Sequence, residues 1–171
     1  MAAIVHNTGT NYSLYYNVLD YFKTIMSNHP SIAAVGQGDI GDLDMEQFPA
    51  YPLGNVNIIQ ATWGENISTY QIELIVADKI KNKNNESTGI TNAQTLPFFK
   101  VDDVVDIHAN TLSILNDLTS YTQRSVDNFE ISGDIVNTPF AERFNNGLAG
   151  WAAVFNLVTH NDRNRCLFEL M

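Results

Sequence analysis

The segment that most constrains the fold of this chain is residues 147–158, with the sequence GLAGWAAVFNLV. Almost all of its side chains are apolar, so a β-strand formed here would present apolar residues on both of its faces. Such a strand is stable at the centre of a sheet or where both faces are covered. We therefore expect a sheet that holds this segment in its interior, with other elements packed over it.

Four other segments have the pattern of strands. Residues 32–35 form a short apolar run. Residues 56–62 and 70–76 lie on either side of Gly64-Glu65-Asn66, a turn signal that predicts a hairpin. Residues 129–135 alternate apolar with polar side chains. Strands joined by a hairpin are antiparallel, so we expect a mainly antiparallel sheet.

Two segments have helical periodicity. Residues 12–27 carry apolar side chains at three- and four-residue spacing, with a second apolar row beside the first, so this helix needs cover on more than one side. Residues 101–121 carry an apolar stripe, made of Val101, Val104, Val105, His108, Leu112, Leu115 and Leu118. At His108 we expect a hydrogen-bonded core histidine rather than a metal ligand. The order of helices and grouped strands predicts an α+β fold: a small, mainly antiparallel sheet with two helices packed on one face.

The length of 171 residues suits a single domain at 1–171. Within it, residues 81–97 are polar and predict a long loop, and residues 159–171 form a C-terminal tail. A single cysteine, Cys166, excludes an intrachain disulfide framework and is typical of a reducing compartment. No apolar run approaches the roughly 20 residues of a membrane span, and no basic segment precedes an apolar one at the start, so we expect neither membrane binding nor a secretory signal.

The formal net charge is −10, from 19 acidic and 9 basic residues. Direct binding to nucleic acid depends on clustered lysine and arginine that neutralise phosphates. Here the basic residues are scattered, apart from the lysines at 79–83. The composition therefore argues against a protein that grips DNA or RNA.

The stretch Gly36-x-Gly38-x-x-Gly41 has the spelling of a dinucleotide-binding loop. That loop functions only between a strand and a helix of a parallel βαβ unit, with the pyrophosphate at the helix N-terminus. Pro49 and Pro52 leave little room for a helix, and the strands that follow are expected to form an antiparallel hairpin. We therefore interpret the glycines as a connection that turns sharply, and we expect no cofactor.

Acidic residues cluster in the same stretch, and four of them are weak candidates for a site that binds a hard cation: Asp39, Asp42, Asp44 and Glu46. The spacing of a calcium-binding loop is absent, because that loop needs acids at positions 1, 3 and 5 with glycine at 6. A small α+β domain that binds a ligand or cation through the acidic turn at 36–46 stays open as an alternative function.

The sequence holds no constellation that predicts catalysis. His6, His29, His108 and His160 lie too far apart for zinc-ligand spacing. Cys166 and His160 could act as nucleophile and base only within a polar C-terminal segment, and no Gly-x-Ser-x-Gly or phosphate-loop spelling occurs. We therefore expect a protein that is not an enzyme and has no catalytic residues.

Three features favour self-assembly over a monomer. They are the first helix with its two apolar rows, the long polar loop, and an apolar C-terminal end. These segments supply the residues that we expect at an interface, namely Tyr12, Tyr16, Asn84, Asn85, Thr91, Leu167 and Phe168.

Several stretches, in their order along the chain, resemble the small neck and tail-completion proteins of tailed bacteriophages, broadly of the tail-terminator type. The similarity lies in the first helix (YYNVLDYFKTIMSNHPSI), the stretch GDIGDLDMEQFPAYPL, the hairpin strand YQIELIVADKI and the C-terminal AGWAAVFNLVTHNDRNRC. It covers nearly the whole chain, and it rests on the order of elements and on diffuse motifs.

The resemblance implies a non-enzymatic virion structural protein at the neck or tail, assembled in the host cytoplasm, with a small antiparallel sheet flanked by helices. It implies a homo-oligomeric ring, hexameric or twelve-fold, that binds the tail-tube protein as a tail terminator or tail-completion protein. A head-side connector adaptor, bound to the portal or connector, is the related alternative. The genome DNA would pass through an acidic lumen without specific binding, because like charges repel. The loop at 81–97 would contact a neighbouring subunit or the tube.

Overall fold

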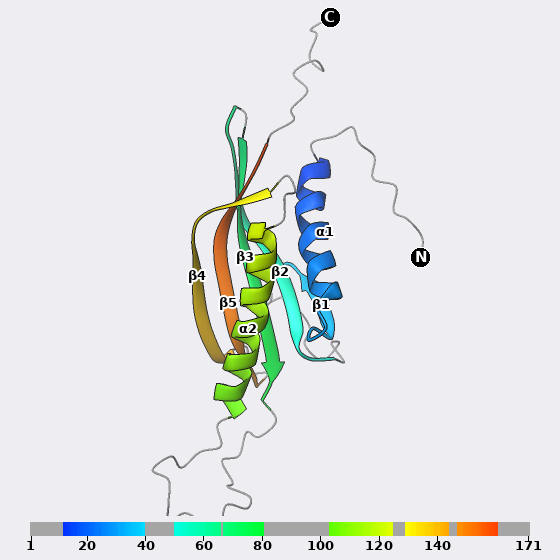
Figure 1. Ribbon diagram of the computed structural model, residues 1–171, viewed down its shortest axis with the longest axis vertical. Helices are drawn as coiled ribbons and strands as arrows, with labels where there is room; N and C mark the ends of the chain where they lie inside the picture. Colours follow the sequence, from blue (N-terminus) through cyan, green and yellow to red (C-terminus); the bar gives the residue numbers. More distant parts are fainter. Residues whose placement is uncertain are drawn as a thin grey trace, which may run out of the picture.

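The computed structural model describes residues 12–39, 50–65, 67–80, 103–124, 129–143 and 147–160. Figure 1 shows how the helices and strands formed by these residues are arranged. The helices are α1 (Tyr12–Asn28) and α2 (Asp103–Arg124), and the strands are β1 (Ala34–Gln37), β2 (Leu53–Trp63), β3 (Ile67–Lys79), β4 (Phe129–Arg143) and β5 (Leu148–His160).

The strands form one sheet in the order β1-β2-β3-β5-β4. β2 and β3 are the predicted hairpin, and β5 pairs antiparallel with β3 on one side and with β4 on the other. The apolar segment near the C-terminal end therefore lies inside the sheet, as its composition predicts. The exception to antiparallel pairing is β1, which is short and runs parallel to β2. The predicted α+β fold with a mainly antiparallel sheet is confirmed.

Both helices pack on the same face of the sheet, and their buried side chains form the main hydrophobic core (Figure 1). Phe22 of α1 and Phe155 of β5 have ring centroids 5.9 Å apart, which ties the first helix to the sheet interior. Each large side chain buried here contributes about 1.5–3 kcal/mol to folding. The buried members are Val18, Leu19, Phe22, Met26, Val56, Tyr70, Ile72, Leu74, Val76, Ile114, Leu115, Leu118, Ala153, Phe155 and Leu157.

A second apolar cluster lies on the opposite face of the sheet. Side chains alternate along a strand, so Ile75 and Ala77 of β3 point away from the helices that cover Leu74 and Val76. This cluster explains why β5 is apolar on both faces, because each face of β5 contributes to a different cluster. The buried members of the second cluster are Leu53, Ile75, Ala77, Phe140, Leu148 and Ala152.

The buried stripe of α2 differs from the predicted one. Val105 belongs to the predicted apolar stripe, yet its side chain is 59% exposed. Threonines occupy part of the buried face instead: Thr111, Thr119 and Thr122 are buried, and each hydroxyl donates to the carbonyl four residues earlier. A hydroxyl that is satisfied by its own helix can be buried without the cost of an unpaired polar group. The pattern of apolar residues in the sequence does not reveal that these threonines are buried.

Both edges of the sheet are short or interrupted. β1 has 4 residues. The pairing of β4 with β5 is irregular between Ser132 and Val136 and again between Ala141 and Arg143. β4 also contains Pro139, which has no N–H to donate. Breaks of this kind hinder the addition of another chain to a sheet edge.

Several predicted boundaries differ from the observed ones. β5 continues to His160, so the first residues of the predicted tail at 159–171 belong to the strand. β4 extends well beyond the predicted residues 129–135. The predicted loop at 81–97 and the rest of the tail lie outside the described residues.

Candidate interaction surface

Large apolar side chains are exposed at one end of the molecule. Tyr121 is 59%, Trp63 58% and Tyr16 56% exposed, values that are high for side chains of this size. We call this group the apolar end, and its residues are Tyr15, Tyr16, Ile59, Trp63, Ile67 and Tyr121.

Strand register and helix direction bring these residues to the same end. Figure 1 shows that α1 begins, α2 ends and the β2–β3 hairpin turns at this end of the molecule. Trp63 pairs with Ser68, Ser68 pairs with Thr159, and Thr159 pairs with Phe129 at the start of β4. The Phe129 ring lies 5.3 Å from the ring of Tyr21, which belongs to α1. The hairpin tip, the end of β5, the start of β4 and α1 therefore lie side by side. Side chains alternate along β3, so Ile67 points away from the helices like Ile75, whereas Trp63, paired with Ser68, is on the helix-covered face.

The β2–β3 hairpin extends past the first turn of α1 in Figure 1. Its turn is closed by the Gly64 N–H, which donates to the Ile67 carbonyl at 2.7 Å. Burial raises the pKa of the Tyr70 phenol, and a hydrogen bond with the Trp63 side chain offsets part of this effect.

A groove runs along the outer side of α2 and reaches the apolar end at Tyr121. It has a volume of about 520 Å³. Its described lining residues recur along one side of the helix, as α-helical geometry requires, and they are Asn116, Asp117, Ser120, Tyr121 and Arg124. We call it the α2 groove; it combines one aromatic ring, one cation and several hydrogen-bonding groups.

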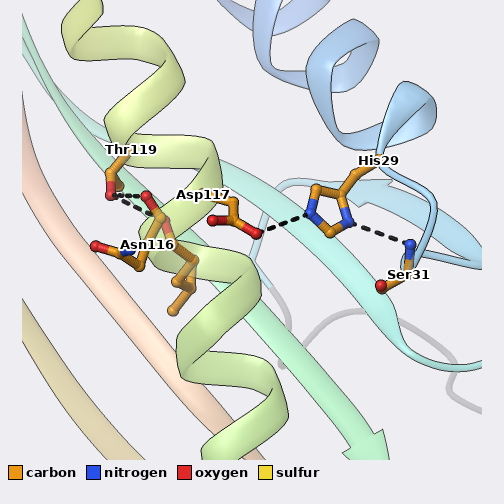
Figure 2. Close-up of polar contacts among 6 residues, drawn as sticks. His29, Ser31, Asn116, Asp117 and Thr119 are labelled. Atoms are coloured by element: carbon orange, nitrogen blue, oxygen red, sulfur yellow. Dashed lines mark hydrogen bonds and ion pairs between the residues drawn. The ribbon is translucent and has the colours of Figure 1, made fainter.

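One wall of the α2 groove is tied to the end of α1 by His29 (Figure 2). The Ser31 N–H donates to Nδ1 of His29 at 3.2 Å, so in the neutral ring the proton resides on Nε2. Nε2 lies 3.6 Å from Oδ2 of Asp117. Figure 2 also shows the Thr119 hydroxyl bonded to the carbonyl of Asn116 at 3.3 Å. The contact between His29 and Asp117 positions the middle of α2 relative to the end of α1.

His108 has a structural role, as its place on the helix stripe predicts. Its Nε2–H donates to the Phe140 carbonyl at 2.9 Å, which joins α2 to β4. The Trp151 indole N–H donates to the His108 carbonyl at 3.0 Å, and the two rings meet edge to face with centroids 5.7 Å apart. The Nε2–H and the main-chain carbonyl of this half-buried histidine therefore join α2 to β4 and β5.

The glycine stretch forms the end of β1 and a turn. Gly36 is buried in β1, and Gly38 has a φ of 91°, a conformation that favours glycine. The Gly38 N–H donates to the Val56 carbonyl at 2.9 Å, and its own carbonyl accepts from the Asn55 side chain at 2.8 Å. Gly41 lies outside the described residues.

The strands that follow the glycine stretch, β2 and β3, form the expected antiparallel hairpin, while β1 runs parallel to β2, a pairing that the sequence did not predict. What the structure places at Gly38 is a turn locked to β2 by Asn55. Of the four cation candidates, Asp39 is exposed, and Asp42, Asp44 and Glu46 lie outside the described residues. Across the described part of the chain, no three histidine, cysteine, aspartate or glutamate side chains come together to hold a metal ion.

The predicted interface residues are only partly described. Tyr16 is exposed at the apolar end. Tyr12 begins α1, but its side chain is not among those described, and Asn84, Asn85, Thr91, Leu167 and Phe168 lie outside the described residues. Residue patterns did not identify Trp63, Ile67 and Tyr121. A signal for the first two was available, because large apolar side chains that flank a hairpin turn signal lie where a sheet has least cover.

No family model matches this chain, and a search of curated proteins finds none that matches it. Neither described helix is long and apolar enough to cross a membrane.

Proposed function

We propose that this chain is a non-enzymatic assembly protein that forms an oligomeric ring at the neck or tail of a tailed bacteriophage. The observation that carries the proposal is the apolar end, where six large apolar side chains are exposed on α1, α2 and the β2–β3 hairpin. Clustered exposed aromatic residues on one surface mark sites of protein association more often than isolated ones do. Tyrosine and tryptophan are also the residues that most often dominate interface energetics.

The location in a virion is supported by the sequence resemblance and by the agreement between the expected and observed element order. The acidic balance of the chain fits this role, because a ring around DNA with a negative lumen would not hold the passing genome. In this proposal the chain acts as a tail terminator or tail-completion protein, with the tail tube as its partner. A head-side connector adaptor would use the same surfaces with a different partner.

The experiment is native mass spectrometry of the purified full chain, alone and after co-expression with the tail-tube protein of the same phage. Negative-stain electron microscopy of any assembly then shows whether it is a closed ring. A closed oligomer in either condition is the expected result. A monomer in both conditions would overturn the tail-terminator proposal, and binding to the portal or connector instead would assign the chain to the head side.

A further inference from the structure

We infer that the β2–β3 hairpin of one copy docks into the α2 groove of a second copy, with Trp63 in the groove and Glu65 facing Arg124. This inference rests on the proposed self-assembly and names the two surfaces that would form the contact. It commits to a second copy of this chain as the occupant of the groove.

The hairpin has the properties of an inserting arm. Ile59, Trp63 and Ile67 are 50%, 58% and 46% exposed, and Figure 1 shows the hairpin extending past the start of α1. The turn of the hairpin is closed by the Gly64 N–H, which donates to the Ile67 carbonyl at 2.7 Å. A backbone that is already ordered loses less conformational freedom on binding, so the arm is preorganised.

The α2 groove has a size and lining that suit this arm. Its volume of about 520 Å³ lies within the 300–1,000 Å³ of typical ligand pockets, so it has room for an indole and a neighbouring side chain. Tyr121 offers a ring that is 59% exposed, and aromatic pairs add about 0.5–1.5 kcal/mol beyond the area that they bury. Trp63 and Tyr121 are both exposed within one molecule, and the inferred contact covers both.

Charge selects this pairing among the possible contacts between copies. The chain has 19 acidic and 9 basic residues, so most approaches of one copy to another bring like charges together. The turn of the hairpin carries Glu65, and the described cation of the groove is Arg124. The acid of the groove, Asp117, already faces His29 at 3.6 Å. The hairpin turn and the groove therefore carry opposite charges, at Glu65 and Arg124.

The sheet edges offer no comparable surface in the described part of the chain. β1 is short, and β4 carries two irregularities and Pro139. The hairpin and the groove are different surfaces, so their contact is heterologous, and contacts of this type close into rings when the rotation between neighbours allows.

The test uses full-length Glu65→Arg and Arg124→Glu chains, with association measured by analytical ultracentrifugation and native mass spectrometry. Each variant alone presents like charges at the contact, so we expect its dissociation constant to rise at least about tenfold, a loss of about 1.4 kcal/mol. An equimolar mixture places the introduced arginine of one variant opposite the introduced glutamate of the other, and we expect it to assemble as well as the wild type. Recovery on mixing excludes misfolding as the cause of the weakened association.

Two further variants control for the change of charge itself. Asp134→Arg and Lys79→Glu change exposed charges outside the hairpin turn and the α2 groove, so both variants should assemble as the wild type does.

The outcomes separate this inference from the proposed function. Rings that form equally well from either variant alone would overturn the inference and leave the proposed ring intact. If the mixed variants recover association only as a two-fold dimer, this result would support the inference and contradict the proposed ring. A wild-type chain that stays monomeric at about 1 mM, where even weak association is visible, would overturn the inference. The proposed function would then depend on recruitment by the tail-tube protein.

Discussion

Trp151 and His108 show how single residues hold α2 on the sheet. The Trp151 side chain packs against the main core and donates its N–H to the backbone of α2. His108 in turn bonds to the Phe140 carbonyl. Two side chains therefore connect the helix to the two strands at one edge of the sheet. Neither contact can be inferred from residue spacing, because the partners lie 43 and 32 residues apart.

Trp151→Ala should destabilise the fold by about 3 kcal/mol, the lower end of the range for buried tryptophan because Trp151 is only half-buried. The change removes both the ring packing and the hydrogen bond to α2. Chemical denaturation followed by circular dichroism measures the effect. Trp151→Phe keeps the ring packing and should cost less; an unchanged midpoint in Trp151→Ala would show that the ring does not support the core.

Gly150 lies where β5 approaches β3 most closely. A Cβ at this position would overlap the Val76 carbonyl oxygen and come within 2.9 Å of the Ala77 Cα. Backbone atoms cannot yield as a flexible side chain can, so Gly150→Ala should lower the free energy of unfolding by more than about 3 kcal/mol or prevent folding. Gly54→Ala is the matched control, because its nearest neighbour is the flexible end of Met26. Equal stability of the two variants in thermal denaturation would contradict the close approach.

The raised pKa of Tyr70 predicts that the fold loses stability at high pH. Burial raises its pKa above the ordinary 10.0, so the folded state keeps the phenol proton more tightly than the unfolded chain. The resulting stability is fully present below pH 10.0 and is lost as pH rises through the folded pKa. The pKa of Tyr51 is raised in the same direction by burial and by Asp78.

Urea denaturation between neutral and strongly alkaline pH should therefore show a falling midpoint above pH 10.0. We expect Tyr51→Phe together with Tyr70→Phe to reduce this dependence, because phenylalanine has no proton to lose. An alkaline slope in the double variant equal to that of the wild type would assign the effect to other groups.

At the scale of elements, each strand and helix depends on where its neighbours place it. β5 is stable as an apolar strand because it lies between β3 and β4, with one face in the main core under the helices and the other in the second cluster. β4 is exposed along most of its length and is bent by irregular pairing at the sheet edge. The β2–β3 hairpin is regular near the core and carries exposed apolar side chains toward its turn. The β2–β3 hairpin is therefore packed into the core at one end and exposes apolar side chains at the other.

Deleting residues 82–95 should leave the fold intact and weaken assembly, because this stretch is polar apart from Ile90 and Ala93. The flanking elements are held together without it: Ile80 and Ile107 belong to one buried cluster, and Val104 packs against them. Circular dichroism and native mass spectrometry check the two parts of the prediction. Loss of cooperative unfolding would show that the stretch is needed for the fold.

At the scale of the whole molecule, the arrangement separates a packed body from an apolar end. The helices cover one face of the sheet, while the hairpin and the first turn of α1 carry aromatic side chains to one end (Figure 1). An apolar end supports the proposed assembly, because a mainly apolar contact limits the repulsion between chains of net charge −10.

The sequence by itself determined the fold class, the two helices, the hairpin and the interior position of β5. These depend on local periodicity and on burial, which side-chain type reports directly. Tertiary structure alone decided the parallel pairing of β1, the buried threonines of α2 and the position of Val105. It also decided that the start of α1, the hairpin turn and the end of α2 lie toward the same end of the molecule, because the pairing of strands and the direction of helices are not recorded in separation along the chain.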